Sequence, residues 1–129
     1  MKSQYLYEED TEKIIGLMYK VHNELGWGYK EKIYEAGAKE ELKEHNYTCT
    51  SQKYSPILYK GKKIGSNRCD ILVDNKILIE IEIGDRLIKR DFDQLNQYLT
   101  NFNIKVGLLI LFSPSGVVPR RLYNDPNYS

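Results

Sequence analysis

Three carboxylates lie close together in two neighbouring segments that have the pattern of β-strands. Asp70 belongs to residues 68–73, and Glu80 and Glu82 belong to residues 77–83, where every second residue is Ile. Because successive side chains of a strand point to opposite faces, the Ile residues share one face and the two Glu residues share the other. Burying an unpaired charge is costly. The pattern therefore indicates either a solvent-facing acidic surface or a metal site.

The register of the two strands decides whether the three acids meet. A two-residue loop after Val73 would place Asp70 and Glu80 on opposite faces of the hairpin. A three-residue loop instead pairs Val73 with Ile77. In that register Asp70 lies opposite Glu80, and Glu82 shares their face. We predict the three-residue loop, because it also keeps apolar residues opposite apolar residues.

Three carboxylates on one small patch repel one another, and a hard divalent cation relieves that repulsion. Oxygen ligands from Asp and Glu suit Mg²⁺ or Mn²⁺. Such an ion activates water and neutralises the charge that develops when a phosphodiester is cleaved. The alternation alone favours the other interpretation, an antiparallel hairpin with one wet acidic face. From the strands by themselves both interpretations stay open.

The rest of the sequence predicts the elements that would position these strands. Apolar residues at helical spacing predict three helices, and β-branched or continuous apolar runs predict strands. The predicted helices cover about 10–25, 29–44 and 85–102, and the strands 47–59, 68–73, 77–83 and 106–112, before a tail after residue 113. Pro56 indicates an edge strand or a bulge. A hairpin, a helix and a fully buried strand in this order predict an α/β (α+β) domain with a mixed sheet and helical cover.

Composition excludes several classes of protein. The 129 residues include 41% hydrophobic and 29% charged residues with a net charge of +1, so no global basic field is present. Two cysteines are too few for a disulfide scaffold. No apolar run is long enough to span a bilayer, and no glycine-rich phosphate loop occurs. We expect a cytoplasmic protein with no membrane partner and no small-molecule cofactor.

Several separated motifs add a resemblance to a known family. Residues 28–34 fit the pattern Gly-x-x-Glu-x-x-Tyr, and Arg68-x-Asp70, Glu80-Ile81-Glu82 and a Gln-containing segment at 94–99 follow in order. This ordered set resembles the small GxxExxY family of the PD-(D/E)XK nuclease-like superfamily. The resemblance implies a restriction-endonuclease-like αβββαβ core over about 11–122, in a single nuclease-like domain spanning 1–129.

The resemblance also implies roles for individual residues. Asp70, Glu80 and Glu31 would bind the metal ion, and Glu82 and Gln94 would complete the catalytic set. Tyr34, Arg90 and Tyr98 are candidates for positioning a substrate, although both tyrosines equally suit packing. Glu31 has an alternative as well, since the helix macrodipole favours an acid in any first helical turn.

One position departs from the family pattern, because Glu82 stands where the signature has Lys. A Glu there can act as a general base or as an extra ligand. Arg90 lies one turn before Gln94 on the same helix face. It could supply the missing positive charge, but it cannot act as a base. Loss of activity is the third alternative.

The sequence therefore supports two hypotheses. The first is a nuclease that depends on Mg²⁺ or Mn²⁺ and hydrolyses phosphodiesters of nucleic acid. The second is a catalytically degenerate domain of the same fold that binds nucleic acid or a protein partner. Basic residues at a predicted turn (Lys60, Lys62 and Lys63) and in the tail (Arg120 and Arg121) could contact phosphates, or they could be solvated charges.

Overall fold

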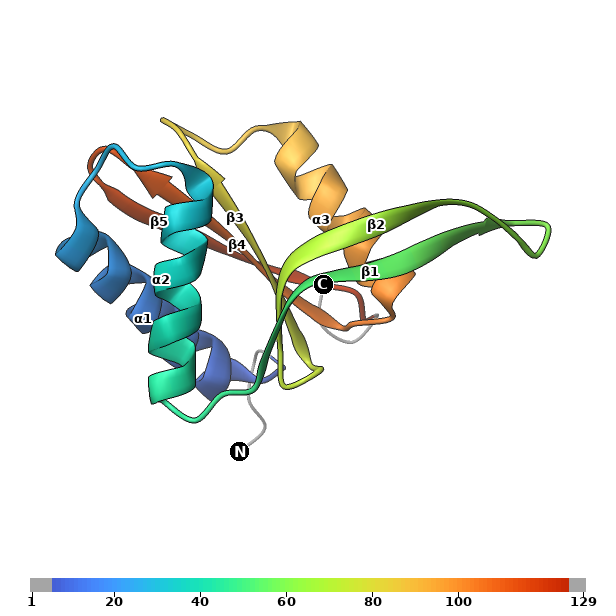
Figure 1. Cartoon of the computed structure of the whole chain (residues 1–129), viewed down its shortest axis with the longest axis horizontal. Helices are drawn as coiled ribbons and strands as arrows, with labels where there is room; N and C mark the ends of the chain where they lie inside the picture. The colour runs from blue at the N-terminus through green and yellow to red at the C-terminus, as the bar shows by residue number, and fades with distance from the viewer. Residues whose placement is uncertain (1–5, 126–129) are drawn as a thin grey trace.

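The computed structural model describes residues 6–125 and shows a mixed five-stranded sheet flanked by three helices (Figure 1). In chain order the elements are α1 (Glu8–Leu25), α2 (Glu31–Glu44), β1 (Cys49–Tyr59), β2 (Lys62–Val73), β3 (Ile77–Ile83), α3 (Lys89–Phe102), β4 (Val106–Ser113) and β5 (Gly116–Tyr123). The strands lie in the order β1-β2-β3-β4-β5, with β3 and β4 parallel and the other neighbours antiparallel. The predicted α+β class, with a meander, a helix and a buried strand, is confirmed.

Two apolar clusters cover the two faces of this sheet. On one face, Ile71, Ile79 and Ile81 pack with the buried residues of α1 and α2. On the other face, Leu72 and Leu78 pack with the buried leucines of α3. The alternation of β3 therefore separates isoleucines from leucines. Every residue of β4 is buried, as expected for a strand covered on both faces.

The hairpin of β2 and β3 has the predicted register. Val73 pairs with Ile77 and Ile71 with Ile79 across a three-residue loop. Asp74 and Asn75 in this loop adopt left-handed backbone conformations, with φ of 52° and 55°, which Asn and Asp tolerate better than most residues. The register that brings the acids together is therefore set by this loop.

Beyond Ile71 the two strands of the hairpin separate. Pairing between β2 and β3 ends at Ile71 and Ile79, whereas β1 and β2 stay paired out to Tyr59 and Lys62. Residues 53–68 thus form a two-stranded ribbon, here called the arm, which projects away from α1 and α2 (Figure 1). Pro56 lies in the edge strand β1, next to a register shift at residues 57–58, as its sequence predicted.

The predicted boundaries require several corrections, and one is that β2 begins at Lys62 rather than at residue 68. The tail after residue 113 contains the strand β5, which pairs along the whole of β4. Pro119 concealed this strand in the sequence, but an edge strand accommodates a residue that cannot donate a hydrogen bond. α1 begins at Glu8 rather than at residue 10, and α2 and α3 begin later than predicted, at Glu31 and Lys89. Among residues 6–125, no helix is both long and apolar enough to cross a membrane.

Candidate functional site

Asp70 and Glu80 are joined by reciprocal hydrogen bonds at the point where β2 separates from β3. The backbone N–H of Asp70 donates to Oε2 of Glu80 at 2.7 Å. The backbone N–H of Ile81 donates to Oδ2 of Asp70 at 2.8 Å. Each carboxylate therefore replaces the backbone acceptor that the separating strands no longer supply. This exchange fixes both acids beside the end of the ladder.

The two carboxyl groups are withdrawn from solvent rather than displayed on a wet face. Glu80 is only 4% exposed, and Asp70 is half-buried. Burial raises the pKa of both groups, and repulsion from Asp70 raises the pKa of Glu80 further. The hydrogen bond from Ile81 opposes the rise at Asp70. The interpretation of β3 as a solvent-facing acidic surface is therefore wrong for Glu80.

Glu31 and Glu82 extend this pair to a group of four interacting acids. Burial raises the pKa of Glu31 to about 7, with contributions from Asp70 and Glu82. Burial likewise raises the pKa of Glu82 to about 7, with repulsion from Asp91 and Asp70 and an opposing effect of Arg90.

Glu31 also lies in the first turn of α2, where the helix macrodipole favours a charged carboxylate. Burial and the acids of β2 and β3 act in the opposite direction and raise its pKa. Carboxyl groups from three separate elements, α2, β2 and β3, are thus close enough to affect one another.

The Gly-x-x-Glu-x-x-Tyr segment directs Glu31 toward this place. Gly28 has a φ of 114°, which favours glycine, in the connection before α2. Tyr34 is fully buried, and its hydroxyl donates to the carbonyl of Gly26 at 2.6 Å. Its ring stacks on Phe112 with 4.5 Å between centroids. Of the two roles considered for Tyr34, the buried position supports packing, which holds the start of α2 against β4.

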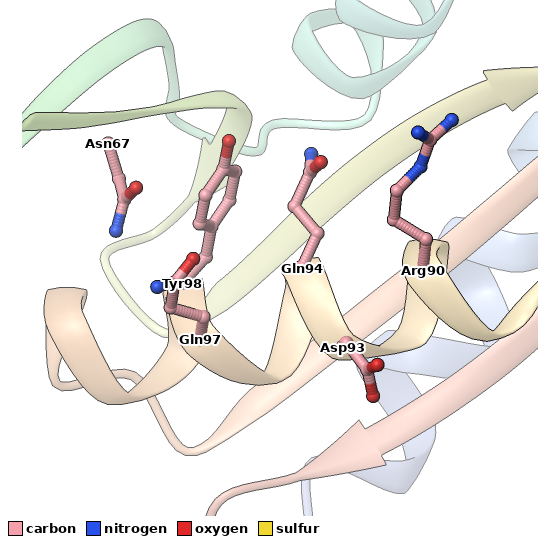
Figure 2. Close-up of a pocket in the computed structure, with 6 residues that line it drawn as sticks. All are labelled: Asn67, Arg90, Asp93, Gln94, Gln97 and Tyr98. Carbon is pink, nitrogen blue, oxygen red and sulfur yellow. The ribbon is translucent and has the colours of Figure 1, made fainter.

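Helix α3 brings polar side chains to the other side of the acids. Nε2 of Gln94 lies 3.5 Å from Oε1 of Glu80, a long hydrogen bond. Figure 2 shows Arg90, Gln94 and Tyr98 projecting from one side of α3, while Asp93 points away from them. Arg90 and Gln94 therefore share a helix face, as predicted.

A cavity of about 430 Å³ lies along this face of α3. Its lining consists of Asn67, Arg90, Asp93, Gln94, Gln97 and Tyr98. Tyr98 is half-buried there, and burial, Glu80 and Asp70 all raise its pKa. The cavity joins Arg90, Gln94 and Tyr98 of the predicted set, whereas Tyr34 lies in the core.

Sequence reasoning missed three polar residues around the site. Glu35 is 7% exposed, accepts a hydrogen bond from Nε2 of Gln52 at 2.6 Å, and raises the pKa of Glu31. The sequence could have indicated Glu35, because it follows Glu31 by four residues and therefore shares its helix face. Gln97 has a similar signal, because it follows Gln94 by three residues on α3. Asn67 has none, since its approach depends on the contact between the arm and α3.

The acids provide suitable chemistry for a hard divalent cation. Among residues 6–125, no three His, Cys, Asp or Glu side chains are grouped as ligands around one point. One oxygen of Asp70 and one oxygen of Glu80 each accept a hydrogen bond from a backbone N–H. The donor atoms of these acids are nevertheless all oxygen, which suits such a cation. A bound cation would favour the charged carboxylates and so offset the effects of burial and repulsion that raise these pKa values. The acidic residues thus suit a hard divalent cation in the type of their donor atoms and in their charge.

These features define a class of protein. A meander followed by a helix and a parallel strand, with acids where the second and third strands separate, is the arrangement of a restriction-endonuclease-like fold. A model of the PD-(D/E)XK nuclease superfamily matches residues 8–121. The chain belongs to the PD-(D/E)XK nuclease superfamily.

A solved structure has the same fold. The protein in "Crystal structure of SSO0001" aligns with a TM-score of 0.57 and 24% identity, over 91% of this chain and 59% of that one. This chain thus spans less than two thirds of that protein, and the likeness concerns the fold alone. A comparison with curated proteins gave no match.

Proposed function

We propose that this protein is a divalent-metal-dependent nuclease of the GxxExxY type, which uses Mg²⁺ or Mn²⁺ to hydrolyse phosphodiester bonds of nucleic acid. The observation that carries the proposal is the withdrawn pair Asp70 and Glu80 at the end of the ladder, with Glu31 and Glu82 near enough to be affected by its charge. A protein retains such a destabilising group when function requires it, and functional sites commonly hold acids with raised pKa values. Membership of the superfamily supports the same reaction class.

Asp70, Glu80 and Glu31 would hold the ion. When bound, a divalent ion supplies an activated water and charge neutralisation for phosphodiester hydrolysis. Gln94 orients Glu80 through its amide. The carboxyl group of Asp70 is oriented by the N–H of Ile81.

Glu82 is the residue that we assign to the attacking water. Burial and repulsion raise its pKa to about 7 in the metal-free fold, and a bound cation would favour the charged form, which is the form that accepts a proton. Arg90 favours the charged form of Glu82. Its guanidinium would also stabilise negative charge on the phosphate that is attacked. This pair replaces the Lys of the family signature with a separate base and cation.

The second candidate is a degenerate domain that binds nucleic acid or a protein partner without cleavage. The replacement of Lys by Glu82 favours it, as does the absence of a grouped three-ligand set among the described residues. The two candidates differ in whether the acids bind metal and whether bound nucleic acid is cut.

Calorimetric titration with Mn²⁺ and Mg²⁺ separates them, followed by cleavage assays on single- and double-stranded DNA and RNA. We expect the wild-type chain to bind Mn²⁺ and to cut, and Asp70→Asn to do neither. Metal binding without cleavage of any substrate would establish the degenerate domain. Absence of metal binding to the wild type would refute the proposed metal site.

A further inference from the structure

The arm concentrates the positive charge of an otherwise acidic molecule. Residues 53–68 contain no Asp or Glu, and their five cationic residues are Lys53, Lys60, Lys62, Lys63 and Arg68. Since the whole chain has a net charge of +1 and the arm alone contributes +5, the remaining residues carry −4. All five cations are exposed. The near-neutral total therefore conceals two regions of opposite charge.

Exposed apolar and aromatic side chains accompany these cations on the arm. The largest exposed fractions among the big hydrophobic residues belong to Ile64 at 67% and Tyr54 at 61%, with Leu58 and Tyr59 at 60%. Tyr54 lies directly opposite Arg68, and Tyr59 lies directly opposite Lys62. Cross-strand partners of this kind share one face of a ribbon. The two pairs lie on opposite faces, because residues five apart on a strand point to opposite sides, so each face of the arm presents an aromatic ring beside a cation.

The direction of the arm is fixed by its attachment to α3. Nδ2 of Asn67 donates to Oδ1 of Asn101 at 3.0 Å, and Nδ2 of Asn101 donates to the carbonyl of Pro56 at 2.8 Å. The hydroxyl of Ser55 donates to the carbonyl of Asn101 at 3.1 Å. These bonds occupy the face of the ribbon that carries Ser55 and Asn67. Tyr54 and Arg68 belong to the opposite face, because their side chains alternate with that pair.

The dimensions of the arm match a groove of a double helix. Two paired strands lie about 5 Å apart, and the major groove of B-DNA, about 12 Å wide, admits a two-stranded ribbon. Lys62 precedes Asp70 by eight residues on the same strand, which is about 26 Å at roughly 3.3 Å per residue. That length corresponds to about eight base pairs at roughly 3.4 Å each.

We propose that the arm is a docking surface for double-helical DNA. The ribbon would lie in the major groove, and the lysines at its tip (Lys60, Lys62 and Lys63) would contact phosphates about eight base pairs from the acids. The proposal rests on the proposed function for its choice of nucleic acid as the partner. Pairing of two arms from two copies of the chain is disfavoured, because it would oppose five cations to five cations. Lysines on an exposed ribbon also discourage pairing with another strand.

Binding of a fluorescent DNA duplex of roughly 20 base pairs, measured by anisotropy in EDTA over a series of salt concentrations, tests this proposal. Three neutralised phosphate contacts contribute about 2.7 to the slope of log Kobs against log salt. We expect the slope of the variant Lys60→Gln/Lys62→Gln/Lys63→Gln to be smaller than that of the wild type by about 2.7. Between 50 and 200 mM salt, the wild type should therefore lose about 40-fold more affinity than the variant.

The matched control is Lys13→Gln/Lys20→Gln/Lys43→Gln, which removes the same charge from exposed positions on α1 and α2. It should keep the wild-type slope. Equal slopes for the two triple variants would overturn the proposal. So would an equal effect of the tip variant on single-stranded DNA, or a change in oligomeric mass with no change in duplex binding.

The two proposals fail separately in this design, because EDTA removes metal-dependent cleavage from the measurement. If the wild-type chain cuts no DNA, but the triple Lys→Gln variant of the arm shows the reduced salt slope, the nuclease proposal is refuted and the proposal for the arm stands. If the wild-type chain cuts DNA, but both triple variants have the same salt slope, the proposal for the arm is refuted and the nuclease proposal stands.

Discussion

The backbone N–H of Asp70 donates to the carboxyl group of Glu80, and the carboxyl group of Asp70 accepts from the N–H that follows Glu80. The acids therefore have a structural role in addition to the metal binding that we propose for them. They satisfy two backbone donors at the point where β2 leaves β3. Substitutions that keep the acceptor oxygen should thus differ sharply from substitutions that remove it.

Glu80→Gln should stabilise the metal-free protein at pH 8, whereas Glu80→Ala should destabilise it. Gln keeps an oxygen for the N–H of Asp70, and it removes the ionisable group whose pKa is raised by burial and by repulsion from Asp70. We expect a gain on the order of 1–2 kcal/mol for Gln. The loss for Ala should be on the order of 1–3 kcal/mol, because a donor is left without its partner. Urea unfolding in EDTA measures both, and a loss for Gln as large as for Ala would contradict this account.

The stability of the metal-free protein should fall as the pH rises from about 5 to 8. Glu31 and Glu82 have pKa values of about 7 in the fold, above the ordinary value of 4.5. Each group therefore binds protons more tightly when folded. The stabilisation is complete below the ordinary pKa, and it is lost as the pH passes through the raised value.

Thermal unfolding in EDTA across this pH range measures the effect. Mn²⁺ should raise the Tm more at pH 8 than at pH 5.5, since protons compete with the ion for the same carboxylates. The double variant Glu31→Gln/Glu82→Gln is the control, and its stability should vary less with pH. A wild-type stability that increases between pH 5 and 8 would contradict the raised pKa values.

Glu82→Gln should separate metal binding from cleavage. If Glu82 accepts the proton of the attacking water, its loss should lower the cleavage rate by about 10²–10⁴-fold. Metal binding should persist, because Asp70 and Glu80 remain. Calorimetry with Mn²⁺ and single-turnover cleavage at several pH values check the two halves. Loss of Mn²⁺ binding in this variant would make Glu82 a ligand instead of a base.

The hairpin of β2 and β3 could be predicted in detail because two local rules agreed on it. Strand alternation placed the acids on one face, and apolar pairing selected the three-residue loop that the structure contains. β4 was equally clear from its unbroken apolar run. Elements with a strong period and a consistent partner are specified locally.

The missed features depend on contacts between distant parts of the chain. β5 contains Pro119 and two arginines, so its identity as a strand comes from pairing with β4 rather than from its own sequence. The cavity on α3 depends on Asn67, which the arm carries to the helix. The burial of Glu80 likewise follows from the cover that α3 gives to β3, which the alternation of β3 could not reveal.

Tyr34→Phe should lower the stability of the protein and change cleavage only slightly. The variant keeps the stacking on Phe112 and loses the hydrogen bond to the carbonyl of Gly26. One such bond contributes about 1 kcal/mol. Tyr34→Ala should cost about 3–5 kcal/mol, because it also removes the buried ring. Urea unfolding and cleavage assays together check this, and a loss of activity in Tyr34→Phe at full stability would instead indicate a catalytic role.

Asn101→Ala should weaken duplex binding without changing its salt dependence. Asn101 holds the arm on α3 through its side-chain bonds to Asn67 and to the carbonyl of Pro56. Without them the arm keeps its cations but loses its fixed direction toward the acids. Loss of one to two such bonds corresponds to about tenfold lower affinity. The slope of log Kobs against log salt should stay that of the wild type, because the lysines remain.

Thr100→Ala is the matched control for this variant. Its hydroxyl bonds only to the carbonyl of Asn96 within the same helix, although Thr100 lies beside Asn101 near the arm. It should leave both affinity and slope unchanged. A lower slope in Asn101→Ala would mean that the lysines reach the phosphates only when the arm is held, and the fixed arm would then set the number of contacts as well as their position.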